Sequence, residues 1–426
     1  MTRADPDGPA VIVDPYSSGA FYAPAFAAAG VPTVAVRSGR AVAEVHRGGY
    51  RPEDFTAVIV NDGDVGAVVD QLRRLAPRCV LPGTETGVEL ADRLAAAVTE
   101  DVANVPAGAA ARCDKGEMGA AVAAAGLAVI RQSCAADPAE VTAWLRREGL
   151  TGRDLVLKPP VGASSAGVTR VPAGGDWRAV FDAQLGRPNH WQVVNDRMLV
   201  QEHVTGTEYV VDTFSYGGVH TVTDVCRYTK VDNGRYMAVY DSMEWLHPQD
   251  PVLPDLIEYA FRVLDAVGVR FGAAHVELML TPAGVRMIEL NARPHGGGQP
   301  RFCRVATGGS QIDRAVRFFA RQGEIPRGYQ LHRTVLVVFL IGRADGVVRN
   351  AEVLGDVRAL PTFHWCSIGV RTGDRIAVTR DLLGSLGLGF VVLAGADRDQ
   401  VLADYQRVRR IEARLRVDAV DQAGVR

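Results

Sequence analysis

Two glutamates and an asparagine have the chemistry and the spacing of a metal site. Alternating apolar and polar residues predict strands over 273–280 and 285–290, joined by a tight turn that makes them antiparallel neighbours. Glu277 and Glu289 then lie close together on one face, with Asn291 two residues further along. Two carboxylates on one face repel each other unless a cation lies between them, and all-oxygen ligands suit Mg²⁺ bound to phosphates. A solvated charged face is the alternative, but the apolar neighbours indicate buried strands.

The same alternation predicts which other side chains share this face. His275 and Met279 accompany Glu277 on the first strand, while Met287 and Arg293 accompany the second glutamate. We therefore expect one mixed polar face to look toward a ligand.

A lysine at the end of a short apolar strand is a candidate for phosphate binding. The strand 155–158 ends in Lys158, and residues 161–168 form a loop of glycine, serine and alanine. Small residues let backbone N–H groups approach phosphate oxygens, while the ammonium group supplies charge. An ordinary turn is the alternative, and the loop is not a Walker A motif because no Gly-Lys-Ser/Thr follows.

The segment 199–209 reads as a strand, a short hinge and a second strand. Exposed backbone at such a hinge can hydrogen-bond the edge of an adenine, and Glu208 can hold ribose hydroxyls. A hairpin with solvated acids is the alternative.

The elements that must position these groups begin with a parallel α/β layer. Apolar strands alternate with alanine-rich helices over the first ~110 residues. Glu85 follows the predicted strand 79–81, and a parallel sheet delivers such residues to a ligand. Further helices are expected at 113–125, 138–148, 177–185, 254–267, 311–322 and 398–414, with β-rich stretches at 154–240 and from 332 onward.

Bulk composition excludes several classes of protein. The formal net charge is only −2, so nothing indicates a nucleic-acid partner. The first ten residues lack the apolar core of a signal peptide, and no apolar run reaches the ~18 residues needed to span a membrane. Six scattered cysteines favour reduced, buried thiols, and we expect a cytoplasmic protein.

Taken in the order in which they occur along the chain, the motifs closely resemble the ATP-grasp superfamily over about residues 11–322. The resemblance is carried by Lys115, the strand lysine with its small-residue loop, the hinge with its glutamate, and the two glutamates with the asparagine and Arg293. It implies an α/β and α+β ATP-grasp fold. The expected domains are an N-terminal parallel α/β domain (1–110), a small ATP-grasp lobe (111–200), a large lobe with the metal and substrate site (201–330) and a β-rich C-terminal extension (331–426).

The resemblance also implies roles for individual residues. Lys115, Lys158, Ser164 and Ser165 are expected at the ATP phosphates, with Arg227 and Lys230 as weaker candidates whose alternative is a solvated strand surface. Gln201, Glu202 and Val204 should frame adenine, and Glu208 the ribose. Glu277, Glu289 and Asn291 should ligate two Mg²⁺ ions, or Mn²⁺ in their place, and Arg293 should stabilise an acyl phosphate and the later tetrahedral intermediate.

Within the superfamily the chain looks most like L-amino-acid ligases and related amide-forming enzymes. The metal strand continues into a glycine-rich loop whose expected substrate contacts are His295, Gly296 and Gly297. Glu244 and His247 stand three apart where those ligases recognise an amino acid, and either is a candidate catalytic acceptor of the amine's proton. Glu85 is a further acid for the substrate. Surface or core roles for these residues are the alternative.

The expected activity is therefore ATP-dependent joining of a small carboxylate to an amine through an acyl phosphate, with release of ADP. The open alternatives are a biotin-carboxylase-like enzyme that activates bicarbonate and a nucleotide-binding regulator without turnover. The sequence leaves open whether the chain forms a homodimer.

Overall fold

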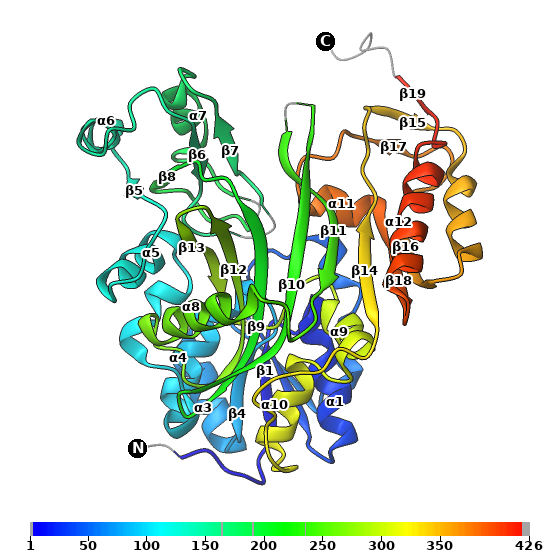
Figure 1. Ribbon diagram of the computed structural model, residues 1–426. Helices are drawn as coiled ribbons and strands as arrows, with labels where there is room; N and C mark the ends of the chain where they lie inside the picture. Colours follow the sequence, from blue (N-terminus) through cyan, green and yellow to red (C-terminus); the bar gives the residue numbers. More distant parts are fainter. Residues whose placement is uncertain (1–2, 163–164, 190, 235, 420–426) are drawn as a thin grey trace.

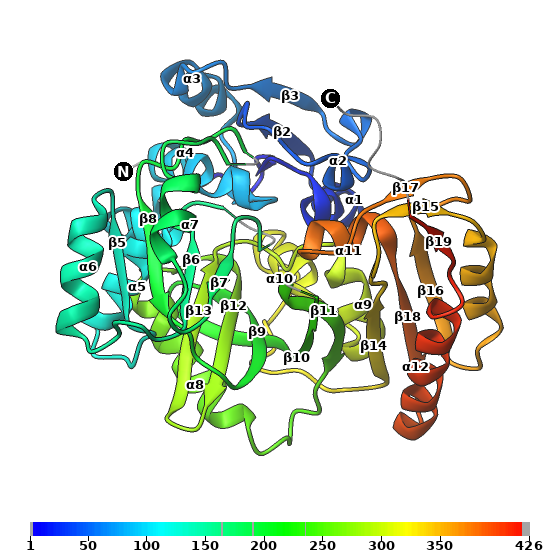
Figure 2. The same cartoon turned by 90° about the horizontal axis from the view of Figure 1, so that it is seen from above.

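In the computed structural model, which describes residues 3–162, 165–189, 191–234 and 236–419, the chain folds around four β-sheets (Figures 1 and 2). The first is a parallel N-terminal layer in the order β3-β2-β1-β4. Its strands are β1 (Ala10–Val13), β2 (Thr33–Arg37), β3 (Ala57–Val60) and β4 (Cys79–Pro82), and its main helices are α1 (Tyr22–Ala28), α3 (Val65–Leu75) and α4 (Val88–Val98). Strand β1 is fully buried, as expected for the centre of a sheet that helices cover on both faces. The predicted parallel layer is confirmed.

The second sheet forms a small lobe with the order β5-β8-β6-β7, all pairs antiparallel. Its elements are β5 (Gln132–Ala135), β6 (Leu155–Lys158), β7 (Thr169–Val171) and β8 (Met198–Glu202), with α6 (Pro138–Arg147) and α7 (Trp177–Gln184). Apolar residues of both helices and the strands share one core. Helix α5 (Lys115–Ala124) precedes this lobe and begins at its lysine, because the Asp114 carboxylate caps the backbone N–H groups of Gly116 and Glu117.

An eight-stranded antiparallel sheet runs through the middle of the molecule. Its order is β13-β12-β9-β10-β11-β14-β18-β16. The strands are β9 (Thr207–Tyr216), β10 (Val219–Asn233), β11 (Tyr236–Trp245), β12 (Gly272–Thr281), β13 (Gly284–Asn291), β14 (Thr334–Phe339), β16 (Phe363–Ile368) and β18 (Gly389–Gly395). Strands from the C-terminal part of the chain therefore continue the same sheet that carries the two glutamates.

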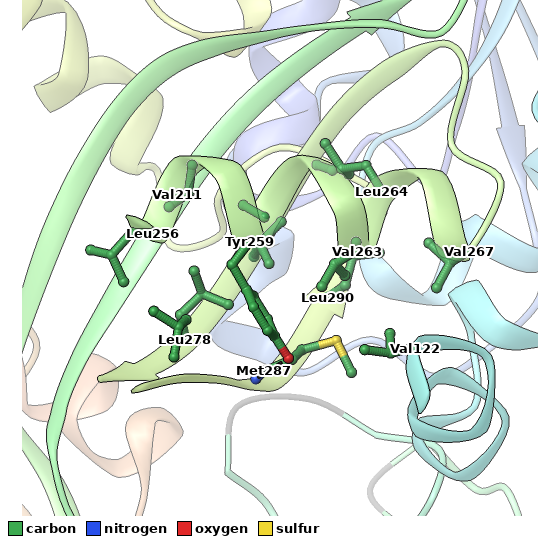
Figure 3. Packing of buried hydrophobic residues seen from close by; sticks show 14 of the residues in the cluster. Val122, Val211, Leu256, Tyr259, Val263, Leu264, Val267, Leu278, Met287 and Leu290 are labelled. Atoms are coloured by element: carbon green, nitrogen blue, oxygen red, sulfur yellow. Dashed lines mark hydrogen bonds between the residues drawn. The ribbon is translucent and has the colours of Figure 1, made fainter. Parts of the chain in front are cut away.

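Helices cover both faces of this sheet. Helix α8 (Leu253–Ala266) packs Leu256, Val263 and Leu264 on the face of β12 and β13 that holds Leu278 and Leu290 (Figure 3). The opposite face packs against α9 (Gln299–Thr307) and α10 (Gln311–Phe319). An apolar stripe at helical spacing on α8 and alternating apolar residues on the strands explain this layering.

The C-terminal part contains helices that the sequence pattern did not reveal, namely the 3₁₀ segment η7 (Ala351–Ala359) and α11 (Leu382–Leu388), which precede the predicted α12 (Arg398–Glu412). Helix α9 was not predicted either. A short sheet of β15 (Gly346–Val348), β17 (Arg375–Ile376) and β19 (Val417–Asp418) lies beside them. The predicted boundary between the two ATP-grasp lobes, at residue 200, falls within strand β8. The domain limits as a whole stay a prediction. No helix in the described ranges is long and apolar enough to cross a bilayer.

Candidate active site

A pocket lies where the small lobe, the eight-stranded sheet and the N-terminal layer meet, and α11 also contributes to its wall. Most of the predicted site residues line it. They are Glu85, Lys115, Lys158, Ser165, Gln201, Glu202, Val204, Glu208, Lys230, Glu277, Glu289, Asn291, Arg293, His295, Gly296 and Gly297. Ser164 falls outside the described residues.

The two glutamates of the predicted metal face are direct cross-strand partners. Glu277 on β12 pairs with Glu289 on β13, as the alternation predicted. Lys115 Nζ lies 3.2 Å from Glu289 Oε1, and His275 Nε2 lies 3.3 Å from Glu277 Oε1. Although burial opposes the shift, the contact with His275 lowers the pKa of Glu277 to about 2, so this carboxylate is ionised at neutral pH.

Asn291 supplies the observation that points to a ligand. Its side-chain oxygen Oδ1 is buried and has no hydrogen-bond partner within the described part of the chain. Buried polar atoms without partners are rare in folded proteins. With the two glutamates, this oxygen makes a hard, all-oxygen donor set that fits Mg²⁺.

A β-bulge corrects one part of the predicted face. The register shifts between Glu277 and Leu278, so that Leu278 opposes Met287. Met287 consequently packs into the apolar cluster under α8 (Figure 3), whereas Ile288 lines the pocket. The expectation that Met287 shares the face of Glu289 is wrong, because a bulge inserts one residue and reverses the alternation beyond it.

All three lysines of the chain line this pocket, although lysine and arginine together number 47. Lys158 Nζ lies 3.5 Å from the Ile288 carbonyl, and burial lowers its pKa to about 8 although Glu289 opposes the shift. Lys115 Nζ donates to the Gly162 carbonyl at 2.5 Å. Lys230 Nζ donates to Glu208 Oε1 at 2.6 Å. This concentration of ammonium groups suits a polyanionic ligand.

The hinge residues lie along the other side of the pocket. The Gln201 amide donates to Gln132 Oε1 at 2.6 Å, and the Glu202 carboxylate is held by Arg131 at 2.6 Å. Val204 follows in the link between β8 and β9. These contacts hold the end of β8 in place beside the pocket.

The half of the pocket beside the N-terminal layer contains one ion pair and a glycine-rich loop held by hydrogen bonds. Arg293 Nε lies 3.1 Å from Glu85 Oε2. Burial raises the pKa of Glu85, although the arginine opposes the shift. The N–H groups of Gly297 and Gly298 each donate at 3.0 Å to a serine hydroxyl of the first turn, Ser17 and Ser18 respectively. The N-terminal layer thus holds the glycine-rich loop in place.

An apolar wall also lines the pocket. It comes from β10, β11 and β14, from α11 and from the segment leading into α2 (Glu44–Arg47), and its members are Val42, Ala43, Tyr228, Tyr240, Met243, Phe339, Leu382, Leu383 and Leu386. A substrate with an apolar side chain would bury that side chain here.

Three predicted site residues do not reach the pocket. Arg227 and Glu244 are cross-strand partners on the opposite face of the sheet, where Glu244 contacts Arg227 Nη2 at 2.5 Å and Arg398 Nε at 2.7 Å. His247 is exposed beyond the end of β11, where its Nδ1 accepts from the Gln249 N–H. The assignments of Arg227 to phosphate and of Glu244 and His247 to substrate or proton transfer are therefore withdrawn.

The position of Glu244 between two arginines predicts that Glu244→Gln affects stability rather than substrate binding. The substitution removes the charge that pairs two arginines, and a lost charge-assisted hydrogen bond in a buried site costs about 1–3 kcal/mol. We expect a lower free energy of unfolding in urea but unchanged KM values for the remaining folded enzyme. An increase in the KM for one substrate, with stability unchanged, would return Glu244 to the substrate site.

Sequence reasoning missed a buried acid at the centre of the site. Asp212 lies in the apolar middle of strand β9, is only 2% exposed, and accepts a hydrogen bond from the ring of His275 and from that of His295. An acid in the middle of such an apolar run was a usable signal, because a buried charge needs partners. The scarcity of lysine was a second signal, which would have placed Lys230 with the other two.

Comparisons with known proteins agree with this geometry. Residues 151–300 match the ATP-grasp domain family. Dapdiamide A synthase of Enterobacter agglomerans is 28% identical over 424 residues, which cover 95% of each chain.

Two solved structures share the fold. The L-amino acid ligase from Bacillus licheniformis superposes with a TM-score of 0.70 at 15% identity, covering 99% of this chain and 100% of the other. The N5-carboxyaminoimidazole synthetase from Staphylococcus aureus, complexed with ADP, gives 0.67 at 11% identity, covering 97% and 99%. At these identities the likeness concerns the fold alone, and it extends through the C-terminal strands and helices.

Proposed function

We propose that this chain is an ADP-forming ligase that joins a carboxylate to an amine, because residues 151–300 match the ATP-grasp domain family and the fold is similar to that of an L-amino acid ligase. The observation that carries the proposal is the pocket face on which Glu277 and Glu289 pair beside the unpartnered oxygen of Asn291. The similarity to dapdiamide A synthase, which spans nearly the whole of both chains, supports an amide as the product.

ATP is proposed to bind between the small lobe and the eight-stranded sheet. Lys115 and Lys158 contact its phosphates, while the hinge at 201–204 borders adenine and Glu208 holds the ribose. The carboxylates and the Asn291 oxygen would hold two Mg²⁺ ions, or Mn²⁺ in their place, which would supply positive charge to the terminal phosphates.

The residues of the chain perform positioning and electrostatic work in the proposed reaction. The substrate carboxylate attacks the γ-phosphorus in line, and ADP departs. The amine then attacks the carbonyl carbon of the acyl phosphate, and phosphate leaves. Arg293 faces the negative charge that develops on the acyl oxygen, which is the role of a preorganised cation.

An amino acid is the proposed amine or carboxylate substrate. The Glu85–Arg293 ion pair offers one group to an ammonium and one to a carboxylate. The neighbouring apolar wall from β11, β14 and α11 favours an apolar side chain on that amino acid. A bicarbonate ion would leave this wall uncovered.

The decisive experiment measures ADP release with single amino acids, with pairs of amino acids, and with bicarbonate plus biotin. We expect stimulation by at least one amino-acid combination, with a new amide detected by mass spectrometry and the strongest response from apolar side chains. ATP without acceptor gives the background rate. Stimulation by bicarbonate and biotin alone would replace the ligase proposal with the carboxylase alternative, and no stimulation by any arm would favour a nucleotide-binding regulator.

A further inference from the structure

A chain of buried polar side chains runs along the wall of the pocket. Asp212 on β9 accepts two hydrogen bonds, from His275 Nδ1 at 2.8 Å and from His295 Nδ1 at 2.7 Å. The two imidazole rings lie with their centroids 4.1 Å apart. Because both Nδ1 atoms face a carboxylate, we assign a proton to each, which leaves both Nε2 atoms directed away from Asp212.

The two histidines differ in what their Nε2 atoms meet. His275 Nε2 lies against Glu277, so this branch of the chain supports the metal face. His295 Nε2 lies 2.9 Å from the hydroxyl of Tyr228, and both residues line the pocket. A neutral His295 ring accepts at Nε2, so the Tyr228 O–H donates to it.

The groups around His295 favour that neutral state at rest. Burial lowers the pKa of His295, and His275 and Arg293 add to this effect, whereas Asp212 opposes it. Burial also raises the pKa of Tyr228, so the phenol keeps its proton. The backbone N–H of His295 donates to Gln311 Oε1 at 2.8 Å, which holds the backbone of this residue in place.

Formation of an amide requires a proton acceptor for the attacking amine. The two residues that the sequence suggested for this role, Glu244 and His247, do not reach the pocket. His295 follows Arg293 by two residues, and both line the pocket together with Tyr228, which contacts His295.

We propose that Tyr228, His295 and Asp212 form a relay that takes the proton of the amine, an inference that rests on the proposed ligase function. As the amine nitrogen bonds to the acyl carbon, the carbon–oxygen bond to phosphate breaks and phosphate leaves with the electron pair. The nitrogen's proton passes to the Tyr228 oxygen while the phenol's own proton passes to His295 Nε2. Asp212 stabilises the resulting imidazolium and is a positioning residue.

The test compares two acceptors in the variants Tyr228→Phe and His295→Gln. The amino acceptor needs a base, whereas hydroxylamine is already neutral at neutral pH and traps the acyl phosphate without one. Loss of a general base lowers rates by about 10²–10⁴-fold. We expect a loss of this size in amide formation, while the rate of hydroxamate formation stays near that of the unmodified enzyme.

Tyr329→Phe is the matched control. This variant also loses a tyrosine hydroxyl, which donates to the Leu246 carbonyl at 2.8 Å outside the pocket, and both rates should be unchanged. ATP binding by calorimetry confirms that each variant is folded, and Asp212→Asn gives an isosteric third variant with the same expected pattern.

Equal losses with both acceptors, or no loss with either, would overturn the relay. The ligase proposal fails in a different way, because the unmodified enzyme would then form neither the amide nor the hydroxamate.

Discussion

Glu289→Gln is expected to reduce ligase turnover by more than about 100-fold at saturating Mg²⁺. The substitution keeps the size of the side chain but removes one of the two paired carboxylate charges on the pocket face. Metal-bound charge stabilisation of a transferring phosphoryl group is worth several kcal/mol, and each ~1.4 kcal/mol of lost stabilisation costs a factor of ten. The measurement is the rate of ADP release as a function of Mg²⁺ concentration.

Glu258→Gln is the matched control for this experiment. Glu258 is an exposed acid of α8, on the far side of the sheet from the pocket, so its neutralisation should leave turnover unchanged. The Glu289 variant should also keep its thermal unfolding midpoint, because Lys115, the partner of Glu289, keeps its hydrogen bond to the Gly162 carbonyl. Turnover like that of the unmodified enzyme would remove Glu289 from the metal site.

The pairing of the two glutamates was predictable because it depends on short-range rules. Strand alternation fixes which side chains share a face, and a tight turn fixes which strand is the neighbour. Glu277 and Glu289 therefore became cross-strand partners as expected. The bulge that turns Met287 toward α8 was not predictable, since nothing in the local pattern of apolar residues marks the inserted position.

Glu244 illustrates the same limit with a larger consequence. The register between β10 and β11 shifts after Thr229, which pairs with Ser242, while Lys230 pairs with Tyr240. As a result Tyr240 and Met243 both face the pocket although they are an odd number of residues apart. A bulge reverses the face of every later side chain. Glu244 therefore lies on the opposite face of the sheet, where it contacts Arg227 and Arg398.

The apolar wall of the pocket depends on contacts between distant parts of the chain. Helix α11 reaches the pocket only because β14 and β18 extend the central sheet beside β11. Periodicity identifies strands but does not say which distant strands will pair. The same holds for Asp212, whose two histidine partners arrive from β12 and from the loop after β13.

Lys158→Ala is expected to raise the ATP concentration needed for half-maximal turnover and to slow phosphoryl transfer. Lys158 is only 5% exposed, and its ammonium makes a long contact of 3.5 Å with the Ile288 carbonyl. A buried ammonium group with so weak a hydrogen bond is strongly stabilised when phosphate oxygens approach it. Charged hydrogen bonds of this kind contribute about 1.5–3 kcal/mol, which corresponds to roughly ten- to a hundred-fold in affinity or rate.

A second variant of Lys158 separates the charge of this residue from its packing, and a variant of Arg170 is the control. Lys158→Met keeps most of the side-chain volume without the charge, so it should lose as much ATP affinity as the alanine variant but less stability. Arg170→Ala removes a cation of β7 that pairs with Asp154 at 2.9 Å, outside the pocket lining, and should not change the ATP dependence. Calorimetric titration with ATP and the KM for ATP in the ADP-release assay provide the two measurements. If the methionine variant binds ATP as tightly as the unmodified enzyme, the buried ammonium does not contact the phosphates, and the proposed position of the nucleotide between the two lobes must change.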